Sequence, residues 1–178
     1  MAILKVSRMG HPVLRQKAAS LTADQLRHPR TQQLIDDMVE TMLDYEGIGL
    51  AAPQVFQPLR LAVLGVPEAG PEEIPLTVVV NPDWLQRSAE QVDGFEGCLS
   101  IPELRGRVPR SARVGVRALD RQGRPFELQA GGLFARVLQH EIDHLDGILF
   151  LDRMKDLSTL AFLEEHRRYW ARQEEEEE

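Results

Sequence analysis

Two histidines separated by one helical turn are the strongest chemical signal in this sequence. Residues 139–144 read Gln-His-Glu-Ile-Asp-His, which places His140 and His144 at positions i and i+4. In a helix, the two imidazoles would lie one above the other and could bind one metal ion. Glu141 would then lie beside that ion, where a carboxylate can act as general base toward a metal-bound water. The spacing therefore predicts metal-assisted hydrolysis.

The identity of a third ligand separates the possible classes of enzyme, because an open tetrahedral site uses three protein ligands and one water. Phe150 stands where one class of zinc protease carries a third histidine, so that class is excluded. A glutamate from a later helix, Glu164 or Glu165, would make the protein a different metalloprotease. The thiolate of Cys98 is the other candidate ligand, although a lone cysteine is commonly an inert buried residue. A metal that only holds the fold together is the noncatalytic alternative.

Composition indicates one globular domain. The chain has 178 residues, of which 43% are hydrophobic and 28% are charged, which suits a folded domain with its own core. A single cysteine cannot form an intramolecular disulfide, so a reducing compartment is expected. The longest apolar runs, 61–66 and 76–80, are too short to span a bilayer, and Lys5 and Arg8 interrupt any secretory segment. We expect no membrane span and no signal peptide.

The charge distribution gives no support for a dedicated nucleic-acid binder. The net charge is −7, and five of the acidic residues form the terminal run at 174–178. Without that run, 21 basic residues face 23 acidic ones, so the body is close to neutral. We expect one domain over residues 1–172 and an acidic, disordered tail over residues 173–178.

Hydrophobic periodicity predicts an α+β fold with antiparallel or mixed sheets, in which a central helix carries the histidines. Apolar residues with a period near 3.6 predict helices at 31–45, from 131 or 132 to 146, and at 157–170, the last with Leu160, Leu163 and Trp170 facing inward. Alternating and β-branched patterns predict strands at 60–66, 76–81, 108–119 and 125–129. Residues 120–123, Asp-Arg-Gln-Gly, predict a hairpin turn between the last two of these strands.

Three short motifs, taken in order, resemble those of the peptide deformylase family. They are Gly47–Gln54 (Gly-Ile-Gly-Leu-Ala-Ala-Pro-Gln), Glu96–Ser100 (Glu-Gly-Cys-Leu-Ser) and Gln139–His144. The resemblance extends from the segment at 11–15 to about residue 156. It implies that Cys98, His140 and His144 are the metal ligands, with Fe²⁺ as the physiological ion and Zn²⁺, Ni²⁺ or Co²⁺ able to replace it.

The same resemblance assigns the remaining catalytic roles. Glu141 would take a proton from the metal-bound water and pass it to the departing amine. The Gln54 side-chain amide and the Leu99 backbone N–H would stabilise the oxyanion together with the metal. Substrate backbone would contact Gly49, and a methionine side chain would enter a pocket formed by Ile48, Leu133 and Val137.

Family members remove the formyl group from N-formylmethionine at the start of new polypeptides and release formate. The resemblance therefore implies nascent peptides as substrates and a bacterial-type cytoplasm or an organelle as the compartment. Relatives can dock on the ribosome through a basic C-terminal helix. Here His166, Arg167, Arg168 and Arg172 would supply such a helix, but the acidic tail at 174–178 would repel phosphate. We therefore expect any ribosome contact to be transient and weakened by the tail.

Overall fold

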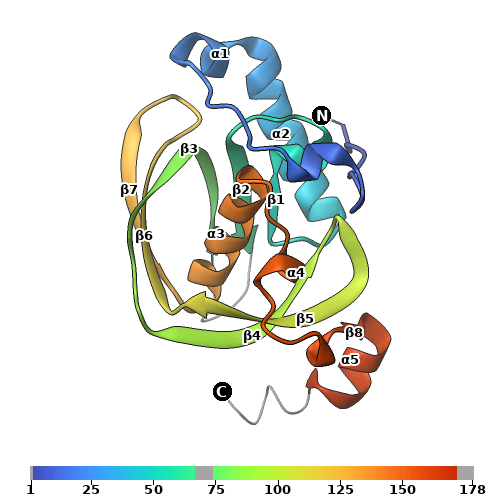
Figure 1. Ribbon diagram of the computed structural model, residues 1–178. Coiled ribbons are helices and arrows are strands. Elements are labelled where there is room, and N and C mark those ends of the chain that lie inside the picture. The colour runs from blue at the N-terminus through green and yellow to red at the C-terminus, as the bar shows by residue number, and fades with distance from the viewer. Residues whose placement is uncertain (1, 67–73, 172–178) are drawn as a thin grey trace.

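Two antiparallel sheets contact opposite parts of the helix α3 (Gly132–Leu145) in the computed structural model, which describes residues 2–66 and 74–171 (Figure 1). The larger sheet has the strand order β1 (Gly49–Ala51), β2 (Leu61–Val66), β3 (Ile74–Arg87), β6 (Arg113–Leu119) and β7 (Pro125–Gly131). The smaller sheet has the order β4 (Gln91–Cys98), β5 (Ile101–Ser111) and β8 (Ala161–Phe162). The predicted α+β class with antiparallel sheets around a central helix is confirmed.

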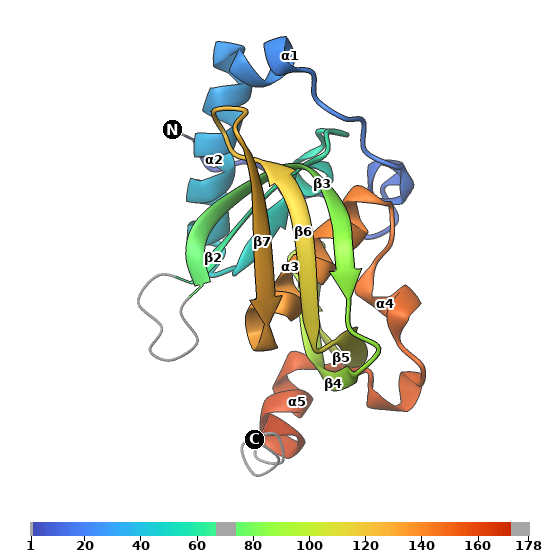
Figure 2. The ribbon, with the colours of Figure 1, turned by 90° about the vertical axis from the view of Figure 1, so that its left-hand side faces the viewer.

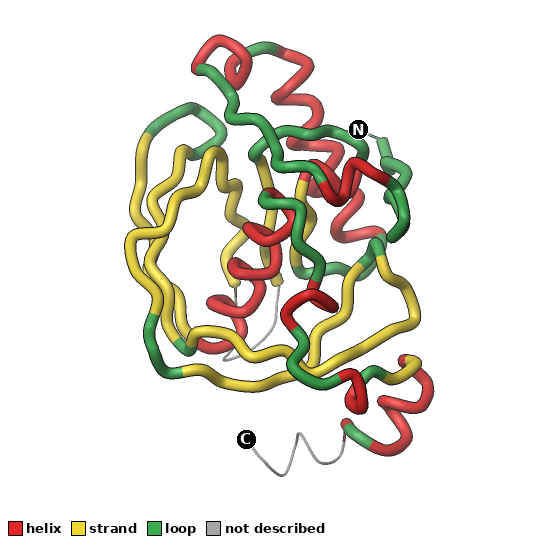
Figure 3. The backbone as a smooth tube through the Cα atoms, in the orientation of Figure 1, coloured by secondary structure: helices red, strands yellow, loops and turns green. Residues whose placement is uncertain are grey.

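The other helices and short helical turns lie around the two sheets and are the red segments of Figure 3 outside α3. Before β1 lie the 3-10 turn η1 (Pro12–Arg15), α1 (Ala23–Arg27) and α2 (Pro29–Asp44), and η2 (Ala52–Val55) follows β1. After α3 come α4 (Phe150–Arg153), η4 (Leu157–Thr159) and α5 (Leu163–Tyr169). None of the helices in the described part of the chain combines the length and the apolar composition that a membrane crossing needs.

The helix predicted at 31–45 is α2, which begins two residues earlier than expected. His28 caps it by accepting a hydrogen bond from the Arg30 N–H at 3.2 Å, and Pro29 fits the first helical position, where no N–H is needed. Met38 and Met42 are fully buried in the core between α2 and the larger sheet. The helix ends where Glu46 adopts a left-handed conformation just before Gly47.

The helix α3 is the structural centre of the molecule. It begins and ends within one residue of the predicted limits. Its apolar face, which includes Ala135, Leu138 and Ile142, is buried against residues of the larger sheet such as Leu64 and Val116. The view in Figure 2 shows strands β6 and β7 passing in front of this helix. One side of α3 therefore packs on the larger sheet, and the helix also contacts β5 of the smaller sheet.

Two of the predicted strands differ from those in the structure. The expected strand at 108–119 is two strands, because the chain leaves the smaller sheet after Ser111 and joins the larger one at Arg113. The expected strand at 76–81 is part of the longer β3, which continues through a left-handed Asn81 and a shift in register. The Asn81 side chain stabilises this bend, because it accepts a hydrogen bond from the Leu21 N–H at 2.9 Å and donates one to the Leu21 C=O at 2.8 Å.

The C-terminal prediction is also wrong in detail. Instead of one helix at 157–170, the chain forms η4, then the short strand β8, and then α5 from Leu163. Phe162 pairs with Leu104 of β5, and this pairing interrupts the helix. Leu160, Leu163 and Trp170 are half-buried, whereas His166 is the buried residue of α5. The proposed tail at 173–178, like Arg172, lies outside the described residues.

Candidate metal centre and active site

Cys98, His140 and His144 bring their side chains to one point between α3 and the end of β4. Their ligand atoms all lie within 4.8 Å of one another. The Nε2 atom of His144 lies 3.2 Å from the Cys98 Sγ atom and 3.2 Å from the His140 Nε2 atom. Cys98 is the last residue of β4 and lies directly before the turn into β5. The fold thus brings Cys98 next to two histidines that follow it by 42 and 46 positions in the sequence.

The geometry of this group fits a divalent metal ion. A tetrahedral ion bound by nitrogen at about 2.0 Å and by sulfur at about 2.3 Å sets its ligand atoms roughly 3.3 to 3.6 Å apart. The two separations of 3.2 Å are close to these values. One thiolate and two imidazoles form a borderline-soft donor set, which suits zinc, ferrous iron, cobalt or nickel. The three residues therefore suffice to hold an ion and leave a coordination position open.

Glu96 orients the first histidine. The Nδ1 atom of His140 donates to the Glu96 Oε2 atom at 2.9 Å, which leaves the Nε2 atom free to point at Cys98 and His144. Such a carboxylate behind a ligating histidine fixes the imidazole tautomer and its orientation. Glu96 lies in β4, two residues before Cys98, so one strand supplies a candidate ligand and the support for a second one.

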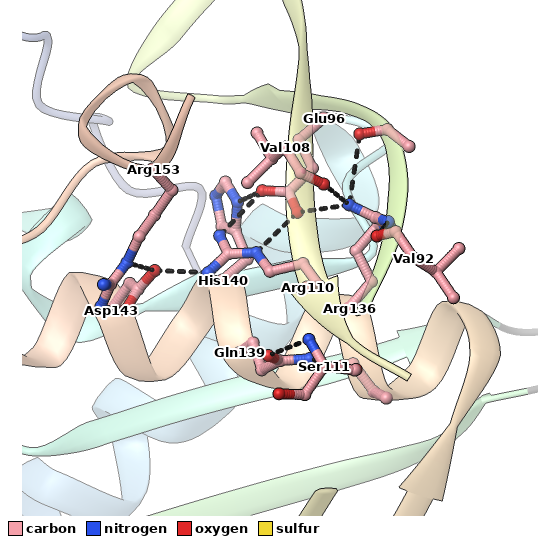
Figure 4. A network of polar contacts seen from close by, with 12 residues as sticks. Val92, Glu96, Val108, Arg110, Ser111, Arg136, Gln139, His140, Asp143 and Arg153 are labelled. Carbon is pink, nitrogen blue, oxygen red and sulfur yellow. Dashed lines mark hydrogen bonds and ion pairs between the residues drawn. The ribbon is translucent and has the colours of Figure 1, made fainter. Parts of the chain in front are cut away.

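A buried ionic network continues from Glu96 behind the histidine (Figure 4). Arg110 of β5 donates to both Glu96 oxygens, at 2.8 and 2.9 Å, and to Asp143 Oδ2 at 2.5 Å. Arg153 completes the chain by bonding both oxygens of Asp143, at 3.0 and 2.7 Å. Burial opposes ionisation of Glu96, but the contacts with Arg110 and His140 prevail and hold its pKa far below the usual range. Glu96 is therefore a permanent carboxylate.

Arg136 ties the smaller sheet to α3 at the same place. Its guanidinium donates to the carbonyls of Val92, Gly94 and Val108 at 2.8, 3.2 and 2.8 Å, and to Glu96 Oε1 at 3.0 Å. A β-carbon on Gly94 would lie 2.8 Å from this guanidinium, so the glycine makes room for it. Strand β4 was not predicted from the sequence, and this clamp is one of the contacts that hold it.

The ionisation of Cys98 suits a metal ligand. Burial by itself raises the pKa of the thiol, but the neighbouring His144 and His140 outweigh burial and lower the pKa well below its usual value. The thiolate is the form that binds metals. The environment therefore prepares Cys98 for ligation instead of leaving it an inert core residue.

Glu141 lies next to the metal group without joining it. Burial raises its pKa to about 7, against the opposing effect of His140 and His144. The Oε2 atom of Glu141 is buried and has no hydrogen-bond partner among the described residues. A β-carbon on Gly49 would lie 2.3 Å from the Oε1 atom, so strand β1 passes directly over the carboxylate. A buried carboxylate with an unsatisfied oxygen and a pKa near neutrality is suited to exchanging protons.

Gln54 presents an amide N–H₂ group to the same point. Its Oε1 atom accepts a hydrogen bond from the Ala51 N–H at 2.8 Å, which fixes the orientation of the amide. The Nε2 atom then lies 3.5 Å from Cys98 Sγ and 3.3 Å from Ser100 Oγ. The donor is therefore aimed from η2 at the group formed by Cys98, His140 and His144.

A cleft of about 670 Å³ opens onto these residues. Its lining includes every residue that the sequence suggested for substrate contact and both oxyanion candidates: Ile48, Gly49, Leu133, Val137, Gln54 and Leu99. Val137 is buried and Leu133 half-buried, both on the turns of α3 that precede His140. The Leu99 side chain lies close to Gly47, since a β-carbon on Gly47 would be 3.0 Å from the Leu99 Cδ1 atom.

The alternative protease ligands are not near this group. Glu164 and Glu165 lie on α5 with side chains that are 81% and 46% exposed, and they face Arg168 at 3.8 and 3.7 Å. Neither belongs to the cluster of potential metal-binding side chains found among residues 2–66 and 74–171. The metalloprotease hypothesis therefore loses its third ligand.

Comparison with known proteins identifies the family. The family model described as polypeptide deformylase matches residues 3–159. The chain belongs to the peptide deformylase family. The peptide deformylase of Thermomicrobium roseum is 45% identical over 167 residues, which cover 92% of each chain. As a member of this family, the protein is an enzyme whose reaction is deformylation.

Solved structures of family members have the same fold. The chain is similar to the Met-Ala-Ser-bound class I type b peptide deformylase from Acinetobacter baumannii, with a TM-score of 0.82, 39% identity, and coverage of 86% of this chain and 99% of that one. It is also similar to the peptide deformylase from Thermotoga maritima, with a TM-score of 0.80, 36% identity, and coverage of 88% and 100%.

The sequence did not predict three supporting roles: Glu96 as the partner of His140, Arg110 as the partner of Glu96, and Arg136 as the link between the smaller sheet and α3. Arg136 was expected only to border the methionine pocket, and it lies in the lining of the cleft. Glu96 carried a usable signal, because ligating histidines generally bond a carboxylate and Glu96 stands in the cysteine motif. The sequence contains no signal for the roles of the two arginines, since their partners are distant in the sequence.

Proposed function

We propose that this enzyme removes the formyl group from the N-terminal formylmethionine of new polypeptides and releases formate. The observation that carries the proposal is the unpartnered Glu141 carboxylate, buried beside the convergent group of Cys98, His140 and His144 at the base of a cleft. A noncatalytic metal site would have no use for such a carboxylate or for the aimed amide of Gln54.

Cys98, His140 and His144 would hold one divalent ion, with Fe²⁺ as the proposed physiological metal and Zn²⁺, Ni²⁺ or Co²⁺ as replacements. Bound there, the ion would supply Lewis-acid activation of water and of the formyl oxygen. Glu96 keeps the His140 imidazole in the tautomer that ligation needs. His144 and His140 lower the pKa of Cys98 against the effect of burial, which favours the anionic form of its sulfur.

Glu141 would carry the proton. As the attacking water adds to the formyl carbon, the Glu141 carboxylate accepts one of its protons. The C–N bond then breaks, and Glu141 delivers the proton to the departing amine, so formate and a free N-terminus are produced. A general base works best with a pKa close to the working pH, and the pKa of about 7 for Glu141 meets this condition.

Gln54 and Leu99 would stabilise the negative charge that forms on the formyl oxygen. The bond from the Ala51 N–H holds the Gln54 amide in place before substrate arrives, so the donor needs no reorganisation. Leu99 follows Cys98 in the turn after β4, and its backbone N–H would supply the second donor.

Substrate recognition would combine an apolar pocket with main-chain contacts. Ile48, Leu133 and Val137 line the cleft and would receive the methionine side chain, while Gly49 would bond the peptide backbone. The similarity to an A. baumannii structure described as Met-Ala-Ser-bound supports a peptide that begins with methionine as the occupant.

New polypeptides place the enzyme at the site of translation, in a bacterial-type cytoplasm or a translating organelle. We propose that any ribosome contact is transient and that the acidic run at 174–178 weakens it by repelling phosphate. Of the basic residues expected to form a docking helix, Arg167 and Arg168 are exposed, but His166 is buried against Phe95 and cannot contribute to a basic surface.

Formate release from formyl-methionyl peptides tests the proposal. Protein purified without oxygen should release formate in proportion to its bound metal and should not cleave internal peptide bonds of the same peptides. A protein that holds one metal ion through these three ligands yet releases no formate would contradict the proposal.

A further inference from the structure

The C-terminal helix α5 forms part of the wall of the substrate cleft. Leu163 and Arg167, one helical turn apart, both line the cleft together with the candidate catalytic residues. Residues four positions apart share one face of a helix, so this face of α5 is turned toward the cleft.

A neighbouring face of α5 fixes the helix to the smaller sheet. The ring of Phe95 in β4 lies 4.4 Å from the His166 ring and 5.6 Å from the Trp170 ring, measured between centroids. The preceding strand β8 pairs with β5 through Leu104 and Phe162. Figure 1 shows α5 in red beside β8 and β5. Arg167 is therefore carried by an anchored element.

The charge on the rim of the cleft is predominantly positive. Within the cleft lining, Glu96 is paired with Arg110 and Arg136, and Glu141 is buried. The remaining charged lining residues are two carboxylates and four basic residues, namely Glu46, Glu103, Lys5, Arg8, Arg105 and Arg167. The guanidinium of Arg167 has no hydrogen-bond or ion-pair partner among the described residues, and the residue is exposed.

The distance from the end of β4 to the place where α5 packs matches the length of a few residues of extended peptide. Phe95, on which α5 rests, stands three residues before Cys98 on β4, a distance of about 10 Å along an extended strand. An extended substrate covers that distance with about three residues. We propose that Arg167 selects acidic side chains within the first three residues after the formylmethionine. This inference rests on the proposed function and adds a preference that the metal group and methionine pocket do not explain.

Peptides that differ at one position test the proposal. C-terminally amidated formyl-Met peptides carry Glu, Gln or Lys at the second, third or fourth residue, and amidation removes the free carboxylate that Arg167 could otherwise bind. At low ionic strength, kcat/KM should be about two- to fivefold higher for Glu than for Gln at one or more positions, mainly through KM, and lowest for Lys. The preference should shrink as salt is added.

Arg167→Gln should bring the Glu-to-Gln ratio to about one, and Arg167→Lys should retain part of the preference. Arg168→Gln is the matched control, because Arg168 lies next in α5 but faces Glu164 and Glu165 outside the cleft. The ratio is measured within one enzyme, so differences in active fraction cancel. A wild-type ratio near one, or a ratio that survives in Arg167→Gln or disappears equally in Arg168→Gln, overturns the inference. Absence of formate release even from the Gln peptides would instead overturn the proposed function.

Discussion

Gly49 and Glu141 approach each other so closely that a β-carbon on Gly49 would lie 2.3 Å from the Oε1 atom of the carboxylate. Neither partner can retreat easily. Gly49 is paired with Leu64 in the larger sheet, and Glu141 is buried in the middle of α3. The absence of a side chain at residue 49 therefore sets the position of the proposed proton carrier.

Gly49→Ala should displace the Glu141 carboxylate and lower kcat by about 10²-fold, since a shift of about 1 Å in a catalytic group has such an effect. Metal content should stay normal, because the atoms nearest to a β-carbon at residue 49 all belong to Glu141 and not to a candidate metal ligand. Formate release and metal analysis of the purified variant measure both quantities.

Gly131→Ala is the matched control for this substitution. A β-carbon at Gly131 would meet no atom closer than 3.9 Å, and the residue has a negative φ of −133°. This variant should keep near-normal kcat. Wild-type turnover in Gly49→Ala would show that the close contact does not constrain Glu141.

Glu96→Gln should weaken metal binding by about 10- to 100-fold, the usual effect of removing a carboxylate behind a ligating histidine. It should also lower the melting temperature of the metal-free protein, because Arg110 would lose a buried charged partner. Competition with a chelator and thermal unfolding provide the measurements. Glu90→Gln, which affects only the exposed pair with Arg113 at 3.2 Å, should change neither property. Equal metal affinity in Glu96→Gln and wild type would rule out this supporting role.

The parts of the structure that could be predicted from the sequence are those with local causes. The helical spacing of His140 and His144 and the period of α2 and α3 depend on neighbouring residues, so both helices and the pairing of the histidines follow from the pattern. The turn at 120–123 is likewise local, with Gly123 at a φ of 81° and its N–H bonded to the Asp120 C=O.

The remaining parts depend on contacts between distant residues. Strand β4 contains two glycines, which disfavour strands, but arginines from α3 and β5 occupy the space beside them: Arg136 at Gly94 and Arg105 at Gly97. The division of the C-terminal segment into β8 and α5 depends in the same way on β5. No periodicity records such pairings, and the same holds for the bond between Glu96 and Arg110.

The iron-loaded enzyme should lose activity in air, because both a ferrous ion and a thiolate such as Cys98 can be oxidised. The nickel-loaded enzyme should keep its activity much longer under the same conditions, and the iron form should persist without oxygen. Turnover followed over time in each of these conditions gives the lifetimes. Equal lifetimes of the iron form with and without oxygen would contradict the assignment of an oxidisable ferrous site.

Truncation after Gln173 should tighten ribosome binding at low ionic strength, because it removes five glutamate side chains that would repel the phosphates of the ribosome. The difference between the truncated and full-length chains should shrink as salt screens these charges. Turnover of formyl-methionyl dipeptides serves as the control and should not change. Equal ribosome binding by both chains at low salt would remove the proposed role of the tail.

The turnover of Glu141→Gln at equal metal occupancy shows whether Glu141 carries the proton. Glutamine keeps the size of the side chain but cannot accept the proton of the attacking water, and general-base catalysis contributes about 10² to 10⁴ in rate. Metal content should equal that of the wild type, because Cys98, His140 and His144 are unchanged. We expect full metal occupancy with kcat reduced by at least about 10²-fold. Near-normal formate release by the fully metal-loaded variant would contradict this role of Glu141.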